Sequence, residues 1–256
     1  MANETDMNSN PKIAIVTGGS RGIGRDAVLS LARRGVRSIF TWHANEAEAG
    51  KVSALAAEAG APAVALQLDT GDVAAFDGFA ARVREALGRM GAERFDFLVN
   101  NAGTSFNASF ADTTEAQLDG LYAVHLKGVF FLTQMLLPLI NDGGRIVNIS
   151  SGLARFSMPN RAAYGAMKAA VESLTRYMAV ELGPRRIAAN VVAPGAIATD
   201  FSGGLVRDNP QVNQMLASHT ALGRVGGPED VGPVIAALLS DEMRWVNGQR
   251  IEVAGG

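Results

Sequence analysis

Short apolar runs alternate with longer amphipathic segments along almost the whole chain, and this alternation restricts the fold more than any other feature. The runs are apolar at consecutive positions rather than at every second one, which is typical of parallel strands buried on both faces. The sequence predicts seven strands, at residues 12–17, 37–42, 63–68, 95–100, 144–150, 188–193 and 250–253.

The segments between the first six strands have helical periodicity, at residues 23–34, 47–59, 72–88, 114–140 and 162–182. Strands that alternate with helices indicate an α/β fold of three layers, a doubly wound Rossmann-like sheet. Right-handed crossovers then place helices on both faces. No Pro/Ser/Gly linker or charge run divides the chain, so residues 11–256 are expected to form a single domain.

Two segments stand outside this pattern. The first ten residues are polar and lack the apolar core of a signal peptide, so they are predicted to be a disordered tail. Residues 194–224 open with a Pro-Gly turn and continue with weak periodicity. A long connection of this kind is usually a lid or a binding loop, and a mobile substrate loop is expected there.

Composition excludes several kinds of protein. The chain has 256 residues, 48% hydrophobic and 19% charged, which is ordinary for a soluble globular protein. It has no cysteine for a disulfide, thiolate metal site or thiol nucleophile, which suits a cytoplasmic location. Its three histidines lack ligand spacing, so no metal is expected. The net charge of −2, with dispersed Lys and Arg, argues against nucleic acid, and the apolar stretch 129–140 is too short to span a membrane.

A glycine-rich turn, Thr-Gly-Gly-Ser-Arg-Gly-Ile-Gly at residues 17–24, follows the first strand and opens the first helix. Glycine permits a tight turn and lets the backbone approach a pyrophosphate, which the helix N-terminus then favours. The spacing is Gly-x-x-x-Gly-x-Gly, and a tight turn without a ligand is the alternative. The turn predicts a dinucleotide site with contacts from Gly18, Ser20, Arg21, Gly22, Ile23 and Gly24.

The end of the second strand indicates which dinucleotide is bound. Folds that select NAD tend to place an acid there for the ribose 2′-hydroxyl, and this chain has none before Glu46. Arg21 and His43 could instead donate to a 2′-phosphate, although each could also be a solvated surface residue. The sequence therefore predicts NADP(H). The ends of the third and fourth strands fit the same crevice, or are ordinary strand-to-loop turns, with candidate contacts at Asp69, Thr70, Asn101, Ala102 and Gly103.

A serine, a tyrosine and a lysine form the candidate catalytic group. Ser151 follows the fifth strand, and Tyr164 and Lys168 stand at i and i+4 on one helix face. A nearby ammonium is expected to lower the pKa of the tyrosine from about 10 toward neutrality. Ser151 could hold a substrate oxygen at the tyrosine hydroxyl. Tyr-x-x-x-Lys alone is common on solvated helices. It indicates a catalytic pair here because the glycine-rich cofactor turn and Ser151 accompany it.

Together with Pro194-Gly195-x-x-x-Thr199, these motifs, in this order, resemble the short-chain dehydrogenase/reductase family over residues 12–256. The similarity is to the single-domain branch that includes 3-oxoacyl-carrier-protein reductases. It implies a seven-stranded parallel sheet in the order 3-2-1-4-5-6-7 and a homotetramer packed through the helices near His125 and Tyr164. It further implies Tyr164 as general acid/base and Lys168 on the nicotinamide ribose. The nicotinamide amide would meet Pro194, Gly195, Ile197 and Thr199.

The chain departs from the family at two positions. His125 replaces an asparagine that helps hold a water behind the catalytic lysine, largely through its backbone carbonyl. His125 is therefore a fourth catalytic candidate, whose imidazole is bulkier and titrates near neutral pH, unless it is a buried core histidine. The chain also has Ala254 where the family often has an acid near the C-terminus, which is expected to change a subunit contact rather than the chemistry.

Apolar side chains surround the candidate catalytic group in the sequence. A substrate pocket is predicted from Ser151 and Tyr164 with Leu153, Phe156, Met158 and Phe201, and with Leu205 and Met215 in the mobile segment. Arg155 and Arg207 could meet an anionic group, although single surface arginines rarely do. These residues favour an apolar or acyl ketone over a free sugar, among them a 3-oxoacyl thioester, small ketone, quinone or hydroxysteroid.

The sequence as a whole predicts an NADP(H)-dependent oxidoreductase that interconverts a ketone and a secondary alcohol by hydride transfer. Two alternatives on the same fold are a nucleotide-sensing binding protein and a structural subunit of a larger enzyme. The presence of both Tyr164 and Lys168 favours the enzyme.

Overall fold

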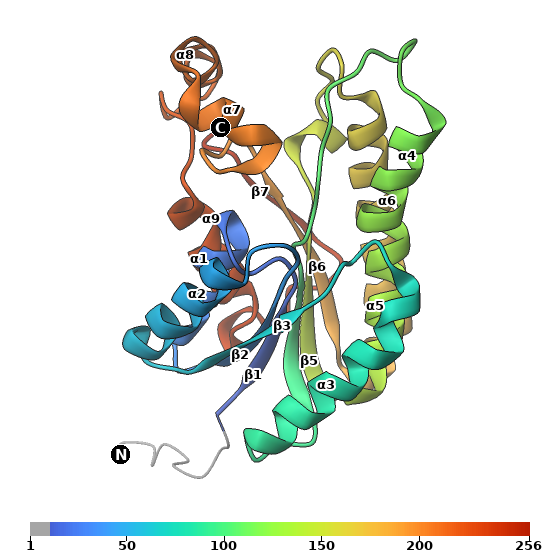
Figure 1. Ribbon diagram of the computed structural model, residues 1–256, viewed down its shortest axis with the longest axis vertical. Helices are drawn as coiled ribbons and strands as arrows, with labels where there is room; N and C mark the ends of the chain where they lie inside the picture. The colour runs from blue at the N-terminus through green and yellow to red at the C-terminus, as the bar shows by residue number, and fades with distance from the viewer. Residues whose placement is uncertain (1–10) are drawn as a thin grey trace.

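The computed structural model describes residues 11–256, and its centre is one parallel sheet of seven strands in the order β3-β2-β1-β4-β5-β6-β7 (Figure 1). This confirms the predicted fold class and strand order. The predicted tail at residues 1–10 lies outside the described residues. The strands are β1 Ile13–Val16, β2 Arg37–Trp42, β3 Ala63–Gln67, β4 Phe95–Asn100, β5 Ile140–Ile149, β6 Ala188–Pro194 and β7 Arg250–Val253.

Helices cover both faces of the sheet, as Figure 1 shows with α1, α2 and α9 on one side and α3, α5 and α6 on the other. Successive strand residues point to opposite faces, so Ile15 packs into one core and Val16 into the other. The helices are α1 Gly22–Ala32, α2 Glu46–Ala59, α3 Phe76–Arg89, α4 Glu115–Tyr122, α5 Gly128–Leu136, α6 Ala162–Glu181, α7 Leu205–Asp208, α8 Pro210–Ser218 and α9 Pro228–Leu238. Burial of every strand residue from β1 and β4 explains their uninterrupted apolar runs.

The fifth strand begins four residues earlier than predicted, at Ile140 instead of 144. Ile140 pairs with Phe95, and the register then shifts before Phe97 pairs with Arg145. Gly143 adopts a left-handed φ of +80° at this irregularity. The expected helix over 114–140 correspondingly ends one residue early, in a 3-10 turn at Leu137–Leu139.

The segment 194–224 is more regular than the sequence suggested, because it contains α7 and α8, which were not predicted. Asn209 caps α8 by accepting a hydrogen bond from the Val212 amide, 3.1 Å long, and Pro210 occupies its first turn. Helices of one or two turns give too little periodicity to be recognised. In Figure 1 both helices stand above the carboxyl edge of the sheet. The helix α9 was likewise missed, and it packs against α1.

The helix from Glu115 to Leu139 is longer than the apolar stretch 129–140, which was judged too short to span a membrane. Among residues 11–256 it is the one helix long and apolar enough to cross a membrane by those criteria alone. A helix that packs on the core of a soluble protein passes the same test. Here Leu121, Leu132 and Leu136 are buried, the last two in the core under the sheet. The middle of the helix is a π-helical turn at Ala123–Lys127.

Candidate active site

One cleft of about 1100 Å³ lies at the carboxyl edge of the sheet, and every residue predicted for the catalytic group, the cofactor site and the apolar pocket lines it. Ligands bind in doubly wound folds at this edge, where the strand order reverses between β1 and β4. The cleft therefore brings together the glycine turn, the end of β2, the turn after β6 and the Ser151, Tyr164 and Lys168 side chains. Lining the cleft does not assign a role, and the individual contacts with ligands stay predictions.

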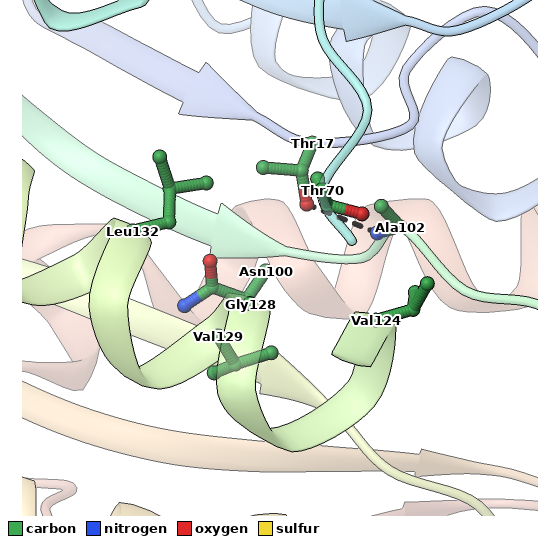
Figure 2. Close-up of a pocket in the computed structure, with 8 residues that line it drawn as sticks. All are labelled: Thr17, Thr70, Asn100, Ala102, Val124, Gly128, Val129 and Leu132. Carbon is green, nitrogen blue, oxygen red and sulfur yellow. Dashed lines mark hydrogen bonds between the residues drawn. The ribbon is translucent and has the colours of Figure 1, made fainter. Parts of the chain in front are cut away.

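Hydrogen bonds join the glycine turn to the loop after β4. The Thr17 hydroxyl accepts from the backbone amides of Asn101 and Ala102 at 2.9 and 3.0 Å, and Figure 2 shows its bond to Ala102. The Asn101 side chain donates to the carbonyls of Thr17 and Gly18 at 2.9 and 3.1 Å. Asn101, predicted as a cofactor contact, thus also holds the turn itself.

The close approach at this joint requires glycine at position 24. A Cβ there would lie 2.3 Å from the Gly18 carbonyl oxygen and 2.4 Å from the Asn101 amide nitrogen. Gly18 itself has a left-handed φ of +64°. The result is a cradle of bare backbone at a helix N-terminus, which fits the pyrophosphate of a dinucleotide.

A second close approach lies directly behind the cradle. Figure 2 shows Gly128, at the start of α5, beside Asn100 and Val129 around a small cavity of about 10 Å³. A Cβ on Gly128 would lie 2.1 Å from the carbonyl oxygen of Thr70. The start of α5 and the loop after β3 therefore approach each other closely at the backbone of Gly128 and Thr70.

The end of the cleft near β2 carries cationic and polar side chains. Arg21 is exposed, and among residues 11–256 its side chain makes no hydrogen bond or ion pair. His43 lies with Nε2 3.6 Å from Asp69 Oδ2, and both side chains are at least half exposed. The strand end itself carries no carboxylate. The arrangement leaves Arg21 available for a phosphate.

The candidate catalytic group forms at the other end of the cleft. Tyr164 and Lys168 are buried on one face of α6, and the Lys168 Nζ lies 5.6 Å from the centroid of the Tyr164 ring. The Lys168 ammonium donates to the Ile149 carbonyl at 2.8 Å, which anchors it to the end of β5. Ser151 begins the next turn and accepts from the Leu153 amide at 3.2 Å.

Burial controls the protonation of this group. It raises the pKa of Tyr164 to about 12, against the lowering effects of the Ser151 hydroxyl and the Arg161 guanidinium. It also lowers the pKa of Lys168 to about 7. The expectation that the lysine lowers the tyrosine pKa is therefore wrong for the cofactor-free protein, because burial penalises the charged form of both groups. In the cofactor-free protein Tyr164 is therefore in its protonated form at neutral pH.

His125 is buried within the π-helical turn and packs edge-on against the Tyr164 ring, with centroids 5.4 Å apart. Its Nε2 lies 2.6 Å from the Thr104 carbonyl oxygen and 3.3 Å from the Thr104 backbone nitrogen, so both polar contacts of this ring nitrogen are with one residue. Its Nδ1 is buried without a hydrogen-bond partner. Burial, and then the charge of Lys168, lower the His125 pKa to about 3. The expectation that this imidazole titrates near neutral pH is therefore wrong.

The substrate end of the cleft is largely apolar. The Phe201 ring lies 5.9 Å from the Tyr164 ring. Phe156 and Met158 are exposed into the cleft from the turn after Ser151. Leu205 and Met215 face them from α7 and α8.

The two arginines considered for an anionic substrate do not line the cleft. Arg155 pairs with Glu252 at 3.1 Å, and Arg207 is paired with Asp200 and Asp208. Arg161 does line it and was missed. Its position three residues before Tyr164 was the available signal.

Ala254, where the family often has an acid, also lines the cleft. The amide of Gly195 donates to the carbonyl of Val253 at 3.1 Å, so the chain after β7 runs beside the turn after β6. The missing acid thus concerns the cleft wall as well as any subunit contact. Within residues 11–256, no three His, Asp or Glu side chains are grouped to hold a metal ion.

Comparison with known proteins identifies the family. The family model described as enoyl-(acyl carrier protein) reductase matches residues 18–256. The tetrahydroxynaphthalene reductase PfmaG of Pestalotiopsis fici is 36% identical over 256 aligned residues, covering 96% of this chain and 91% of the relative.

Two solved structures are similar throughout. The promiscuous reductase LugOII, described as catalysing keto-reduction at C1 during lugdunomycin biosynthesis, has a TM-score of 0.91 and 38% identity, covering 96% of this chain and 97% of its own. The angucycline C-6 ketoreductase LanV with bound NADP has a TM-score of 0.88 and 35% identity, covering 96% and 95%. The chain belongs to the short-chain dehydrogenase/reductase family. It is an oxidoreductase that acts on C=O and CH–OH groups.

Replacement of Lys168 by Met is expected to stabilise the cofactor-free protein, most strongly at low pH. The Lys168 pKa falls from 10.5 to about 7 on folding, so the folded protein binds fewer protons between these values. The cost of burying the ammonium is therefore complete below pH 7 and fades as the pH rises toward 10.5. Urea unfolding at pH 6, 8 and 10 should show a gain that shrinks with pH.

Lys51→Met is the matched control, because Lys51 is exposed and pairs with Glu48 on the surface. Its effect on the unfolding free energy should stay within about 0.5 kcal/mol at every pH. A gain for Lys168→Met that is constant or grows with pH would contradict the burial argument.

Replacement of His125 by Asn is expected to preserve or raise turnover. An asparagine amide has both a donor and an acceptor for the backbone of Thr104, which Nε2 contacts, and the backbone carbonyl at position 125 is unchanged. Steady-state kcat with the best ketone substrate measures the effect, and circular dichroism checks the fold. Loss of activity in a folded variant would make His125 an essential group.

Proposed function

We propose that this protein is an NADP(H)-dependent reductase of apolar fused-ring ketones, with Tyr164 as the general acid. The observation that carries the proposal is the pair Tyr164 and Lys168, buried beside Ser151 where the dinucleotide cradle meets an apolar pocket. The named relatives support the substrate class, since one reduces a tetrahydroxynaphthalene and another an angucycline. Such rings can pack against the aromatic and aliphatic side chains of that pocket.

The bound cofactor supplies the hydride. The hydroxyls of Ser151 and Tyr164 hold the carbonyl oxygen of the ketone, and Tyr164 gives its proton to that oxygen as negative charge develops on it. Lys168, fixed by the Ile149 carbonyl, then stabilises the tyrosinate and takes part in its reprotonation. The apolar side chains around the ring exclude water, which strengthens these interactions.

Arg21 supports the preference for NADP(H). Its guanidinium lies at the start of α1 without a partner among the described residues and offers a bidentate site to a 2′-phosphate. His43, which lines the same cleft, supplies a second donor. The LanV structure holds NADP, which agrees with this choice.

A homotetramer in the cytoplasm is part of the proposal. Several large apolar side chains on the outer faces of α4, α5 and α6 are exposed, which is typical of an interface with other copies. They are Leu118, Tyr122, Phe130, Phe131, Tyr177 and Val180.

The reductase is tested with NADPH and a panel of ketones that includes tetralones, a 3-oxoacyl thioester, a quinone and a steroid. Oxidation of NADPH is expected with a fused-ring ketone. Tyr164→Phe should lower kcat by at least about 100-fold, because it removes the proton donor. Tyr177→Phe, an exposed position on the same helix, should retain full activity.

Two outcomes would favour the alternatives. Cofactor binding without turnover of any ketone would favour a nucleotide-sensing protein. Absence of cofactor binding would favour a structural subunit.

Cofactor preference is tested by kcat/KM with NADPH and NADH. The wild type is expected to prefer NADPH, and Arg21→Gln should lower kcat/KM for NADPH by about 10- to 100-fold, the worth of charge-assisted hydrogen bonds. The value for NADH should change by less than about twofold, because NADH has no 2′-phosphate. Arg25→Gln, exposed one turn later on α1 and outside the cleft, is the control. Equal or better efficiency with NADH in the wild type would refute the preference.

A further inference from the structure

The substrate end of the cleft contains an arginine without an anionic partner. Arg161 precedes the first residue of α6 and lines the cleft. Its Nη1 donates to the Phe106 carbonyl at 3.2 Å and to the Ser105 hydroxyl at 3.4 Å. Both acceptors are uncharged. Among residues 11–256, its Nε and Nη2 make no hydrogen bond, and no carboxylate lies within ion-pair distance.

Most other arginines near the site are neutralised. Arg155 pairs with Glu252, Arg207 with two aspartates, and Arg250 with Glu172 at 2.7 Å. Arg224, after α8, pairs with Asp230. Arg161 therefore differs from its neighbours in carrying its charge into the cleft without compensation.

The positive charge of Arg161 acts on the hydroxyl of Tyr164, the proposed proton donor. Arg161 stands one helical turn before Tyr164, and residues three apart share a helix face. Its guanidinium acts to lower the Tyr164 pKa, in opposition to burial. A group bound by Arg161 would therefore lie close to the ketone that Tyr164 protonates.

The position of the guanidinium is fixed by two loops. Ser105, which accepts from Arg161, is hydrogen bonded to Ser202 at 2.6 Å. The loop after β4 and the segment before α7 thus meet beside the arginine. The cleft wall here also includes the apolar side chains described above, with Asp200, which is already paired with Arg207, as the nearby carboxylate of the lining.

We propose that Arg161 selects ketones that carry an anionic oxygen, a carboxylate or an ionised phenol, on the ring system that fills the apolar pocket. The free Nε and Nη2 form a planar pair of donors that matches such an oxygen. The inference rests on the proposed function as a ketone reductase and adds a charge requirement to its substrate. Arg161 is a binding residue in this account.

Matched probes separate charge from shape. We would use 1-tetralones with a carboxylate at ring position 5, 6 or 7, each beside its methyl ester, with unsubstituted 1-tetralone as the neutral reference. At pH 8 the acids are ionised, while acid and ester have similar shapes. The wild type is expected to show a kcat/KM about 10-fold higher for at least one acid than for its ester, mainly through a lower KM.

Three variants identify the residue responsible. Arg161→Gln should remove the preference for the acid by raising its KM about 10-fold or more, while values for the ester and for 1-tetralone change by less than about twofold. Arg161→Lys keeps the charge and should keep part of the preference. Arg176→Gln, exposed on α6 and outside the cleft, should behave as the wild type.

Two results would overturn the inference while leaving the reductase intact. One is equal use of every acid and its ester by the wild type. The other is a loss in Arg161→Gln that is the same for acid, ester and 1-tetralone and that moves the pH profile of kcat, which would show that Arg161 acts through Tyr164 instead.

Binding decides the case in which no ketone is reduced. That result alone would reject the proposed function. Calorimetric titration of the acids into the protein with NADP⁺ would still test Arg161. A Kd raised about 10-fold by Arg161→Gln would support the inference. A Kd that Arg161→Gln leaves unchanged, or no detectable binding of the acids to the wild type, would overturn it.

Discussion

The hydrogen bonds between the ends of β1 and β4 are the constraint on which the rest of the site depends. The Thr17 hydroxyl and the Asn101 side chain tie the glycine turn to the neighbouring loop, at the point where the strand order reverses. The glycine turn after β1 and the loop after β4 are both held by the sheet, so the position of the cradle relative to the strand ends is fixed. The helix α6 then brings Tyr164 and Lys168 to the same edge from the other side of the molecule.

The fold and most of the site were predictable because their signals are local. Strands buried on both faces give uninterrupted apolar runs, and the glycine turn and Tyr-x-x-x-Lys have fixed spacing. The missed features depend on contacts that spacing does not show. The start of β5 is set by pairing with Phe95, and α7 and α8 are too short for a period to emerge. The unpaired charge of Arg161 could not be recognised from the sequence, because it depends on the absence of a carboxylate among its described neighbours in space.

Protonation was the least predictable property, because it depends on how much water each group loses. His125, Tyr164 and Lys168 lie together and are all buried, and burial favours the neutral form of each. Reasoning from the lysine charge alone gave the wrong direction for Tyr164. The cofactor-free centre is therefore poor in charge.

The close backbone contacts of Gly24 and Gly128 restrict where the protein tolerates mutation. Any side chain at position 24 or 128 would place its Cβ within 2.3 Å of a backbone oxygen, so no substitution fits without moving the main chain. The segment before α7 and the loop after β4 meet through the hydroxyls of two serines, Ser105 and Ser202. A contact between side chains can be replaced without moving the main chain, so the residues at this meeting point can change while the dinucleotide cradle stays fixed, and a new substrate range can evolve without a new cofactor site.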